Sequence, residues 1–154
     1  MTIAELLDVR DVRLLSPVKS KKRLFQEISD IASASTGVAP ADMLEALLER
    51  EGLGPTGVGH GIALPHARVA GVERVVGLFA RLEKPIEFDA VDRKPVDLVF
   101  ALFAPTGAGV DHLKALALVS RTMRDPSTCE KLRANSDPAT LHAVLTAAKE
   151  SQAA

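Results

Sequence analysis

His66 is the sharpest candidate for chemistry in this chain, and it lies near the end of the stretch REGLGPTGVGHGIALPHAR, which runs from Arg50 to Arg68. Pro65 fixes its own φ and keeps the residue before it out of the helical region, so we expect His66 in an extended or turn segment. An imidazole can take a phosphoryl group on one ring nitrogen when a hydrogen bond orients the other nitrogen. Arg50, Arg68 and His112 could complement the charge of that group. A lone histidine is also common as an ordinary surface or core residue.

The glycines in front of His66 raise the alternative of a nucleotide-binding loop, and the motif excludes it. No lysine occurs between Lys22 and Lys84, so the stretch cannot supply G-x-x-x-x-G-K-[ST]. Its glycines run G-x-G-x-G, without the G-x-x-G end of a dinucleotide fingerprint, and a predicted helix rather than a strand precedes them. A tight turn that passes close to another backbone explains the glycines better, but it leaves Thr56 without a role.

Other kinds of catalytic site find little support in the sequence. The chain has four histidines: His60, His66, His112 and His142. There is no H-E-x-x-H, and the interval from His60 to His66 crosses Pro65, so no metal-site spacing is present. Cys129 is the only cysteine, which excludes an internal disulfide and a cysteine cluster. No G-x-S-x-G marks a hydrolase nucleophile. We therefore expect no metal and no cofactor.

Composition indicates one intracellular domain. The chain has 154 residues, of which 47% are hydrophobic, and its 19 basic and 20 acidic residues leave a formal charge of -1. A charge this small creates no field that attracts nucleic acid or a membrane, so partners must be chosen by local patches. Charged residues interrupt the N-terminal segment, and no apolar run approaches the roughly 20 residues of a membrane span. We expect a cytoplasmic protein without membrane insertion.

Hydrophobic periodicity places helices and strands on both sides of the central stretch. The expected helices cover a short turn at 3–7, residues 20–37 and 40–50, and segments that begin near 110, 126 and 138. The expected strands cover 12–15, 75–82 and 96–103, with a weaker segment at 86–88 after a turn at Lys84-Pro85. These elements predict an α/β layered single domain over residues 1–150, followed by a tail at 151–154, and they leave the strand order open.

The run RE-x-LG-x-TG-x-G-x-GIALPHAR resembles the active-site signature of the phosphotransferase-system enzyme IIA domains of the mannitol/fructose/nitrogen-regulatory family. The likeness continues through PIEFDAVDRKPVDLVFALFAP, through HLKALALVSR and through Leu132-Arg133. It also extends backwards through SKKRLFQEIS and MLEALLERE, so it covers nearly the whole chain. Motifs of this length and order are specific to the family.

The resemblance implies a three-layer α/β/α sandwich around a small mixed sheet. It also implies that His66 accepts a phosphoryl group from the phosphohistidine of an HPr-like carrier protein, with Arg50 and His112 lining the site. His112 would sit at a helix N-terminus, where the dipole disfavours its cationic form. We expect His112 to be a neutral donor that orients His66 or meets the phosphoryl group, and Arg50 to stabilise oxyanions. The resemblance does not say which ring nitrogen is phosphorylated.

Further residues of the same stretch are expected to contact the partner or the phosphoryl group: Thr56, Gly57, Gly59, Gly61 and Arg68. The glycines would let a carrier protein approach closely and would offer backbone N–H groups to the phosphoryl group. Arg68, which is close to His66 in the chain, would steer the anionic partner.

The resemblance favours the nitrogen-regulatory type of enzyme IIA, a phosphorylation-dependent regulator that binds potassium-transport components and sensor kinases. The chain carries one domain, Cys129 lies in a helical context without a IIB-type cysteine loop, and the stretch has the form TG-x-G-x-G-x-A-x-PH. One alternative is a fructose or mannitol component that passes phosphate to a IIB domain. The other is an interaction module without phosphotransfer.

Overall fold

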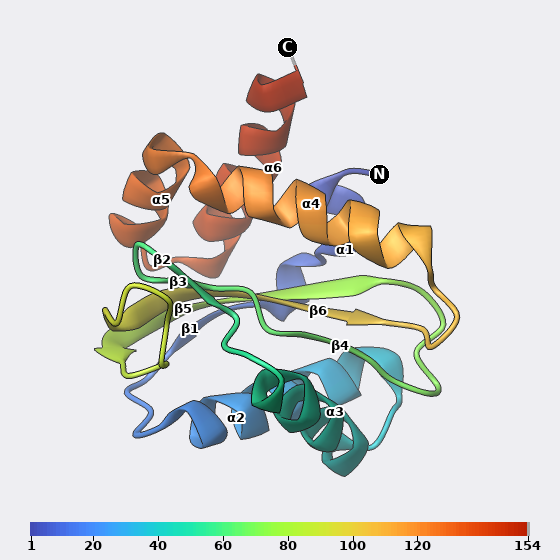
Figure 1. Ribbon diagram of the computed structural model, residues 1–154. Coiled ribbons are helices and arrows are strands. Elements are labelled where there is room, and N and C mark those ends of the chain that lie inside the picture. The colour runs from blue at the N-terminus through green and yellow to red at the C-terminus, as the bar shows by residue number, and fades with distance from the viewer. Residues whose placement is uncertain (154) are drawn as a thin grey trace.

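The fold is a three-layer α/β/α sandwich in which one mixed sheet lies between two layers of helices (Figure 1). The structure, a computed structural model, describes the backbone of residues 1–153 and the side chains of residues 1–147. The helices are α1 (Ile3–Leu6), α2 (Lys21–Thr36), α3 (Pro40–Gly52), α4 (Val110–Arg124), α5 (Pro126–Arg133) and α6 (Pro138–Ala153), with a 3-10 turn at Val9–Asp11. The strands are β1 (Val12–Leu15), β2 (Gly57–Gly59), β3 (Ile62–Ala63), β4 (His66–Arg68), β5 (Val76–Ile86) and β6 (Val96–Ala104). In Figure 1, α2 and α3 cover one face of the sheet, and α1, α4, α5 and α6 cover the other.

Strand β6 organises the sheet, whose order is β1-β5-β6-β3-β2, with β4 also paired to β6. It runs antiparallel to β5 and parallel to β3 and β4, so that Leu98 lies opposite Ile62 and Leu102 opposite His66. Pro65, just before β4, has no N–H to donate, but its carbonyl accepts a hydrogen bond from the backbone of Leu102 at 2.9 Å. The chain therefore stays extended alongside β6, and His66 begins strand β4.

Burial on both faces explains why β6 is apolar except at Asp97. All but one of its residues are buried, and successive side chains enter different cores. Ala101 and Phe103 pack into the core beneath α2 and α3, whereas Phe100 and Leu102 pack into the core beneath α1, α4, α5 and α6. This strand is a rigid support for the segment that carries His66.

The ends of α2 and the start of α5 occur where the sequence indicated. The hydroxyl of Ser20 accepts the backbone N–H of Arg23 at 3.1 Å and caps α2, which ends before Gly37 with its φ of 78°. Asp125 caps α5 in the same way, and Pro126 occupies the first helical position. The helix expected between residues 40 and 50 differs slightly, because α3 continues to Gly52.

Two features of the strands differ from the expectation. The turn expected at Lys84-Pro85 is wrong, because β5 continues through it to Ile86. A register irregularity with β6 between Arg81 and Ile86 means that Pro85 removes no ladder hydrogen bond. The second difference concerns β2, β3 and β4, which have three residues or fewer and were expected only as an extended or turn segment.

The expected boundary between domain and tail, at residue 150, lies within helix α6. The backbone of α6 extends to Ala153, so it includes most of the segment expected to be a tail, and residue 154 lies outside the described residues. In the part of the chain that the structure describes, no helix combines the length and apolar character needed to cross a membrane.

Gly57→Ala is expected to lower the free energy of unfolding by about 1–3 kcal/mol. A Cβ at this position would lie 2.7 Å from the Cβ of Ala90 and 2.9 Å from its Cα, so the backbone itself would have to move. The matched control is Gly107→Ala, because a Cβ there meets no atom within 4 Å. Urea unfolding of both variants tests the prediction, and equal transition midpoints would contradict it.

Candidate active site

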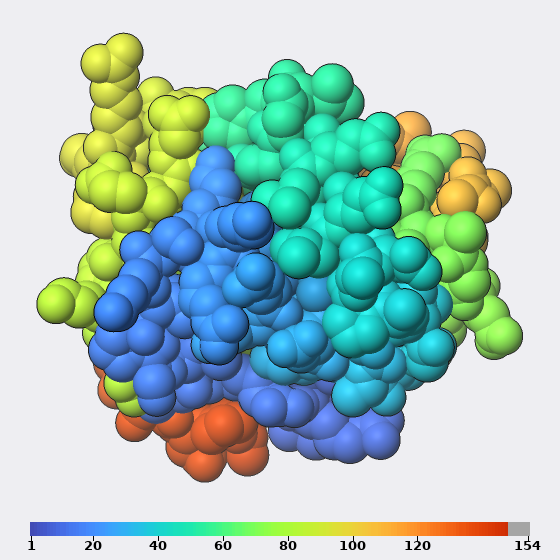
Figure 2. Space-filling view, turned by 90° about the horizontal axis from the view of Figure 1, so that it is seen from below, coloured from blue at the N-terminus to red at the C-terminus, as the bar shows by residue number. Residues whose placement is uncertain are grey.

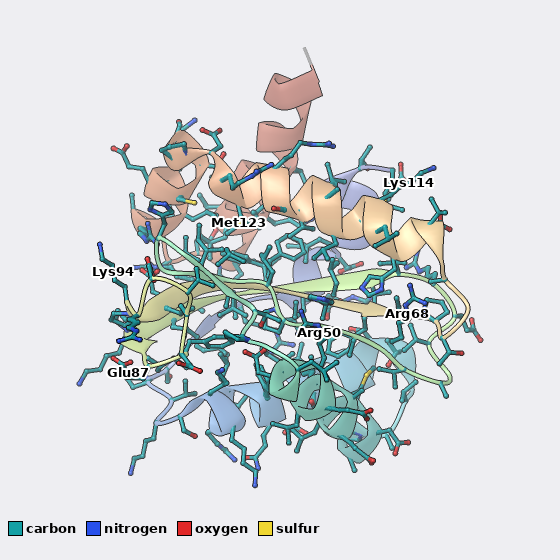
Figure 3. All side chains as sticks on the ribbon, in the orientation of Figure 1. Arg50, Arg68, Glu87, Lys94, Lys114 and Met123 are labelled. Carbon is teal, nitrogen blue, oxygen red and sulfur yellow. The ribbon has the colours of Figure 1, made fainter. Side chains whose placement is uncertain are left out.

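A cavity of about 410 Å³ gathers residues from three elements that are distant in the sequence. Its basic groups are Arg50 at the end of α3, His66 and Arg68 on β4, and His112 in the first turn of α4. One carboxylate, that of Glu49 on α3, also lines the cavity. Figure 3 shows Arg50 and Arg68 in the space between α3 and α4, whereas Lys114 lies on the outer side of α4. A larger cavity of about 620 Å³ beside α1 is lined by no histidine, so size alone does not locate the site.

The hydrogen bonding of His66 determines which ring nitrogen is nucleophilic. Its Nδ1 lies 2.8 Å from the backbone oxygen of Leu64. A carbonyl oxygen can only accept, so the proton of a neutral ring is on Nδ1 and the lone pair is on Nε2. Burial lowers the pKa of His66, the bond to Leu64 opposes this, and the charge of Arg50 lowers the pKa further. The ring is therefore neutral near pH 7, with its lone pair on Nε2.

The two ring nitrogens of His112 differ in their hydrogen bonding. Its Nδ1 accepts a hydrogen bond from Nε of Arg68 at 3.2 Å, so its proton is on Nε2. That Nε2 is buried and has no hydrogen-bond partner among the described residues, and the ring is 5.6 Å from that of His66, centroid to centroid. Burial, followed by the nearby His66 and Arg68, lowers the pKa of His112. An unpartnered buried N–H is costly, so it marks a place for an acceptor from outside the chain.

This geometry separates the two roles that the sequence left open for His112. The backbone of Leu64 makes the hydrogen bond that orients His66, and no bond joins the two imidazoles. His112 therefore does not orient His66 through a hydrogen bond. The remaining role, donation to a bound group, fits the free Nε2–H.

Arg50 is held at the rim of the cavity by its own loop. It lies in the last turn of α3, and its Nη1 donates to the backbone oxygen of Gly54 at 2.9 Å. A cation in the last turn of a helix also interacts favourably with the helix dipole, so Arg50 has a structural role as well as a place in the cavity. Its charge is close enough to His66 to lower the pKa of that ring.

Thr56 and the three glycines do not line this cavity. Thr56 is only 4% exposed, and its hydroxyl donates to Glu51 at 2.6 Å. Gly57 and Gly59 lie in β2, and Gly61 has a φ of 78° in the turn that leads to β3. A Cβ on Gly61 would lie 2.5 Å from an Arg133 nitrogen, which identifies a packing role. Contact of these residues with a partner stays a prediction.

Sequence reasoning missed several residues that shape the site. The carbonyl of Leu64 has no signature in a sequence, because every residue has one. Leu53 and Leu113 line the cavity with exposed fractions of 83% and 64%, but scattered leucines are normal on surfaces. Glu51 follows Arg50 in the stretch that resembles the family signature. This position was the only sequence signal for a role of Glu51 in the site. Among the described residues, no group of three or more His, Cys, Asp or Glu side chains could hold a metal ion.

Both imidazoles of the cavity are expected to titrate below their ordinary value of 6.5. The unfolded chain then binds more protons than the folded chain as pH falls below 6.5, so stability is lost through this window and is fully present above it. NMR titration of the ring C–H signals and urea unfolding at a series of pH values measure both effects. The depressed pKa values of Asp8 and Asp92 act in a separate window below 3.8. Imidazole midpoints at or above 6.5 would contradict the prediction.

Comparison with known families decides how this arrangement of side chains is classified. The sequence matches the family model described as "Phosphoenolpyruvate-dependent sugar phosphotransferase system, EIIA 2" over residues 5–148. The chain belongs to this family. Membership in the EIIA 2 family supports a phosphotransfer role and confirms the resemblance seen in the sequence.

Relatives within the EIIA 2 family include both regulatory and sugar-specific proteins. A nitrogen regulatory protein of Bradyrhizobium diazoefficiens is 46% identical over 145 residues, covering 94% of this chain and 95% of that protein. The crystal structure of nitrogen regulatory protein IIA-Ntr from Neisseria meningitidis has a TM-score of 0.86 and 39% identity, covering 94% of this chain and 99% of that one. A fructose-specific EIIA component of Haloferax volcanii is 37% identical over 136 residues, covering 82% of this chain and 88% of that protein. The expected three-layer fold is thus confirmed, and the regulatory relatives are the more similar of these.

Proposed function

We propose that this protein is a histidine phosphocarrier of the nitrogen-related phosphotransferase system that acts as a phosphorylation-dependent regulator. The single observation that carries the proposal is that His66, with its proton held on Nδ1, shares one cavity with Arg50 and the unpartnered N–H of His112. A neutral imidazole with a free lone pair, beside a cation and a neutral donor, suits an acceptor of an anionic phosphoryl group.

The transfer step follows from the hydrogen bonding of the two histidines. Nε2 of His66 attacks the phosphorus of a phosphohistidine on an HPr-like carrier protein. A new P–N bond forms on His66 while the P–N bond to the carrier breaks, and the electron pair of that bond returns to the carrier's imidazole. The carbonyl of Leu64 stabilises the positive charge that develops on the His66 ring. Arg50 and Nε2–H of His112 would stabilise the phosphoryl oxygens.

The depressed pKa of His66 and the apolar rim suit this reaction. A ring that stays neutral at pH 7 keeps its lone pair available to a phosphoryl donor. Leu53 and Leu113 are largely exposed beside the cavity, and exposed leucines at a functional site suit a protein partner better than a small molecule. Arg68, which lines the same cavity and binds His112, also adds positive charge for an anionic donor.

The regulatory reading rests on the relatives, of which the nitrogen regulatory proteins have the higher identities among those compared. Phosphorylation would add about 1.5 to 2 negative charges to this face and so change which proteins can dock there. Potassium-transport components and sensor kinases are the partners we expect, in the cytoplasm. The alternative is a fructose or mannitol component that relays the group to a IIB domain, which the fructose-specific relative favours. A non-catalytic interaction module is disfavoured because His66, Arg50 and His112 are all present.

Phosphorylation with purified components tests the proposal. The protein is incubated with phosphoenolpyruvate and enzyme I, and with either a nitrogen-branch or a sugar-branch HPr protein. We expect an acid-labile phosphoryl group, faster transfer from the nitrogen-branch carrier, and ¹⁵N NMR signals that locate the group on Nε2 of His66. No phosphorylation from either carrier would overturn the proposal. Rapid relay onward to a sugar-specific IIB domain would favour the transport alternative.

A further inference from the structure

Glu51 is a nearly buried carboxylate that the transfer step does not use. Its side chain is 7% exposed and accepts three hydrogen bonds. The backbone N–H of Thr56 donates to Oε2 at 2.9 Å, and the hydroxyl of Thr56 donates to Oε1 at 2.6 Å. The ammonium group of Lys21 completes the set, 2.9 Å from Oε2. The ammonium group and the backbone N–H both donate to Oε2, so the carboxyl group of Glu51 binds two other parts of the chain at once.

Lys21 shows how the fold brings a counter-charge to this carboxylate. It is the first residue of α2, its side chain is 23% exposed, and its Nζ lies 4.4 Å from the centre of the Phe88 ring. Figure 2 shows α2 beside α3 on this face, with the yellow-green segment that precedes β6 next to them. Lys21 of α2 and Thr56 of the following loop therefore meet at Glu51, and the ring of Phe88 lies beside the ammonium group of Lys21.

One chain of hydrogen bonds runs from Glu51 to the ring of His66. Glu51 holds the N–H and hydroxyl of Thr56, and the carbonyl of Thr56 accepts the N–H of Leu64 at 2.9 Å. The carbonyl of the same Leu64 accepts Nδ1–H of His66 at 2.8 Å. Movement of Thr56 would therefore displace the group that selects the tautomer of His66.

A second connection joins Glu51 to Arg50. The two residues are consecutive at the end of α3, and the loop from Glu51 to Thr56 is closed by the carboxylate. Gly54 lies in this loop: its N–H donates to the backbone oxygen of Glu51 at 3.2 Å, and its carbonyl accepts Nη1 of Arg50 at 2.9 Å. The same carboxylate thus supports the loop that holds the cavity's arginine.

We propose that Glu51 is a positioning residue for phosphoryl transfer, which sets the orientation of His66 through Thr56 and Leu64 and that of Arg50 through Gly54. Glu51 itself does not line the cavity. The inference rests on the proposed function, because the reaction it serves is phosphorylation of His66. Supporting groups of this kind decide whether a site is held in its productive geometry.

Glu51→Gln is the main test, because glutamine keeps the shape of the side chain and removes its charge and one acceptor oxygen. We expect phosphorylation of His66 to slow by about tenfold or more, since small displacements of reacting groups have large effects on rate. The ¹⁵N shifts of the His66 ring are expected to report a mixture of tautomers in place of the single Nδ1–H form. The pKa of His66 is expected to fall further, because the charge of Glu51 raises it in the wild-type protein.

Matched variants separate positioning from general stability. Glu45→Gln makes the same charge change on the exposed side of α3, and we expect wild-type rates and ring shifts from it. Thr56→Val removes the hydroxyl but keeps the backbone N–H, whereas Thr56→Ser keeps both donors. We expect Thr56→Val to slow transfer and to mix the tautomers of His66. We expect Thr56→Ser to keep the wild-type rate and the single Nδ1–H tautomer. If Glu51→Gln does not fold, the two Thr56 variants test the positioning role in its place.

The outcomes distinguish this inference from the function on which it rests. If wild-type protein is not phosphorylated on His66, the proposed function fails, and the ring shifts alone then test the positioning. If wild type is phosphorylated and folded Glu51→Gln matches it in rate and tautomer, the positioning role is overturned. A lower unfolding midpoint with unchanged rate and ring shifts would also overturn it, because that is the behaviour of a merely structural carboxylate.

Discussion

His66→Ala is expected to abolish phosphorylation by the HPr-like carrier. The substitution removes Nε2, which is the only lone pair that the hydrogen bonding leaves free on a cavity imidazole, since Nδ1 of His112 is occupied by Arg68. The side chain is partly exposed and its ring bonds only to a backbone oxygen, so we expect the fold to persist. Acid-labile label after incubation with phosphoenolpyruvate, enzyme I and carrier is the measurement.

His60→Asn is the matched control for the loss of a histidine. His60 lies in the turn between β2 and β3 with a φ of 58°, a conformation that asparagine tolerates, and its side chain is exposed. The backbone N–H of His60 donates to the side chain of Asp92, and its backbone oxygen accepts from the side chain of Arg133, so the imidazole takes part in neither bond. We expect full labelling of this variant. Label that persists in His66→Ala would remove His66 as the acceptor and direct attention to the other histidines.

Arg50→Ala is expected to slow phosphorylation by about tenfold to a hundredfold without abolishing it. Arg50 supplies charge to the cavity and lies close enough to His66 to lower the pKa of its ring. Removing that charge should weaken stabilisation of the phosphoryl oxygens, whereas the nucleophile and its orienting carbonyl remain. Rapid-quench measurement of the transfer rate from the phosphorylated carrier tests this.

Two further variants sharpen the test of Arg50. Arg50→Lys keeps the charge but not the planar fork of donors, so an intermediate rate is expected. Lys114→Ala removes one positive charge from α4 on the side away from the cavity, and we expect its rate to match wild type (Figure 3). If Arg50→Ala also transfers at the wild-type rate, the residue has only its structural contact with Gly54.

The surface around the cavity explains how a small domain can serve both as a carrier and as a regulator. The cavity opens between the ends of α3 and α4, and Leu53 and Leu113 are exposed at its rim. A phosphoryl group on His66 would place negative charge beside these leucines. A partner that packs on the apolar rim would therefore sense the phosphorylation state directly.

Short-range patterns in the sequence were enough to place most helices. Ser20, Gly37, Asp125 and Pro126 act through groups a few residues away, so their signals survive without tertiary context. The turn predicted from Pro85 was wrong for the opposite reason. Its effect depends on whether a neighbouring strand needs its N–H, and the irregular register between β5 and β6 removes that need.

The sequence by itself determined the chemistry available to this protein: a histidine placed after a proline, an arginine at the end of a helix, a second histidine at the start of another, and the family to which they belong. Only the tertiary structure decided how these groups act. It brought His112 to within 5.6 Å of His66, placed the protons of both rings, and turned Thr56 inward to Glu51. The physical reason is that a tautomer or a buried hydrogen bond depends on partners from other parts of the chain, such as Arg68 and His112, which are 44 residues apart. No local pattern encodes such a pairing.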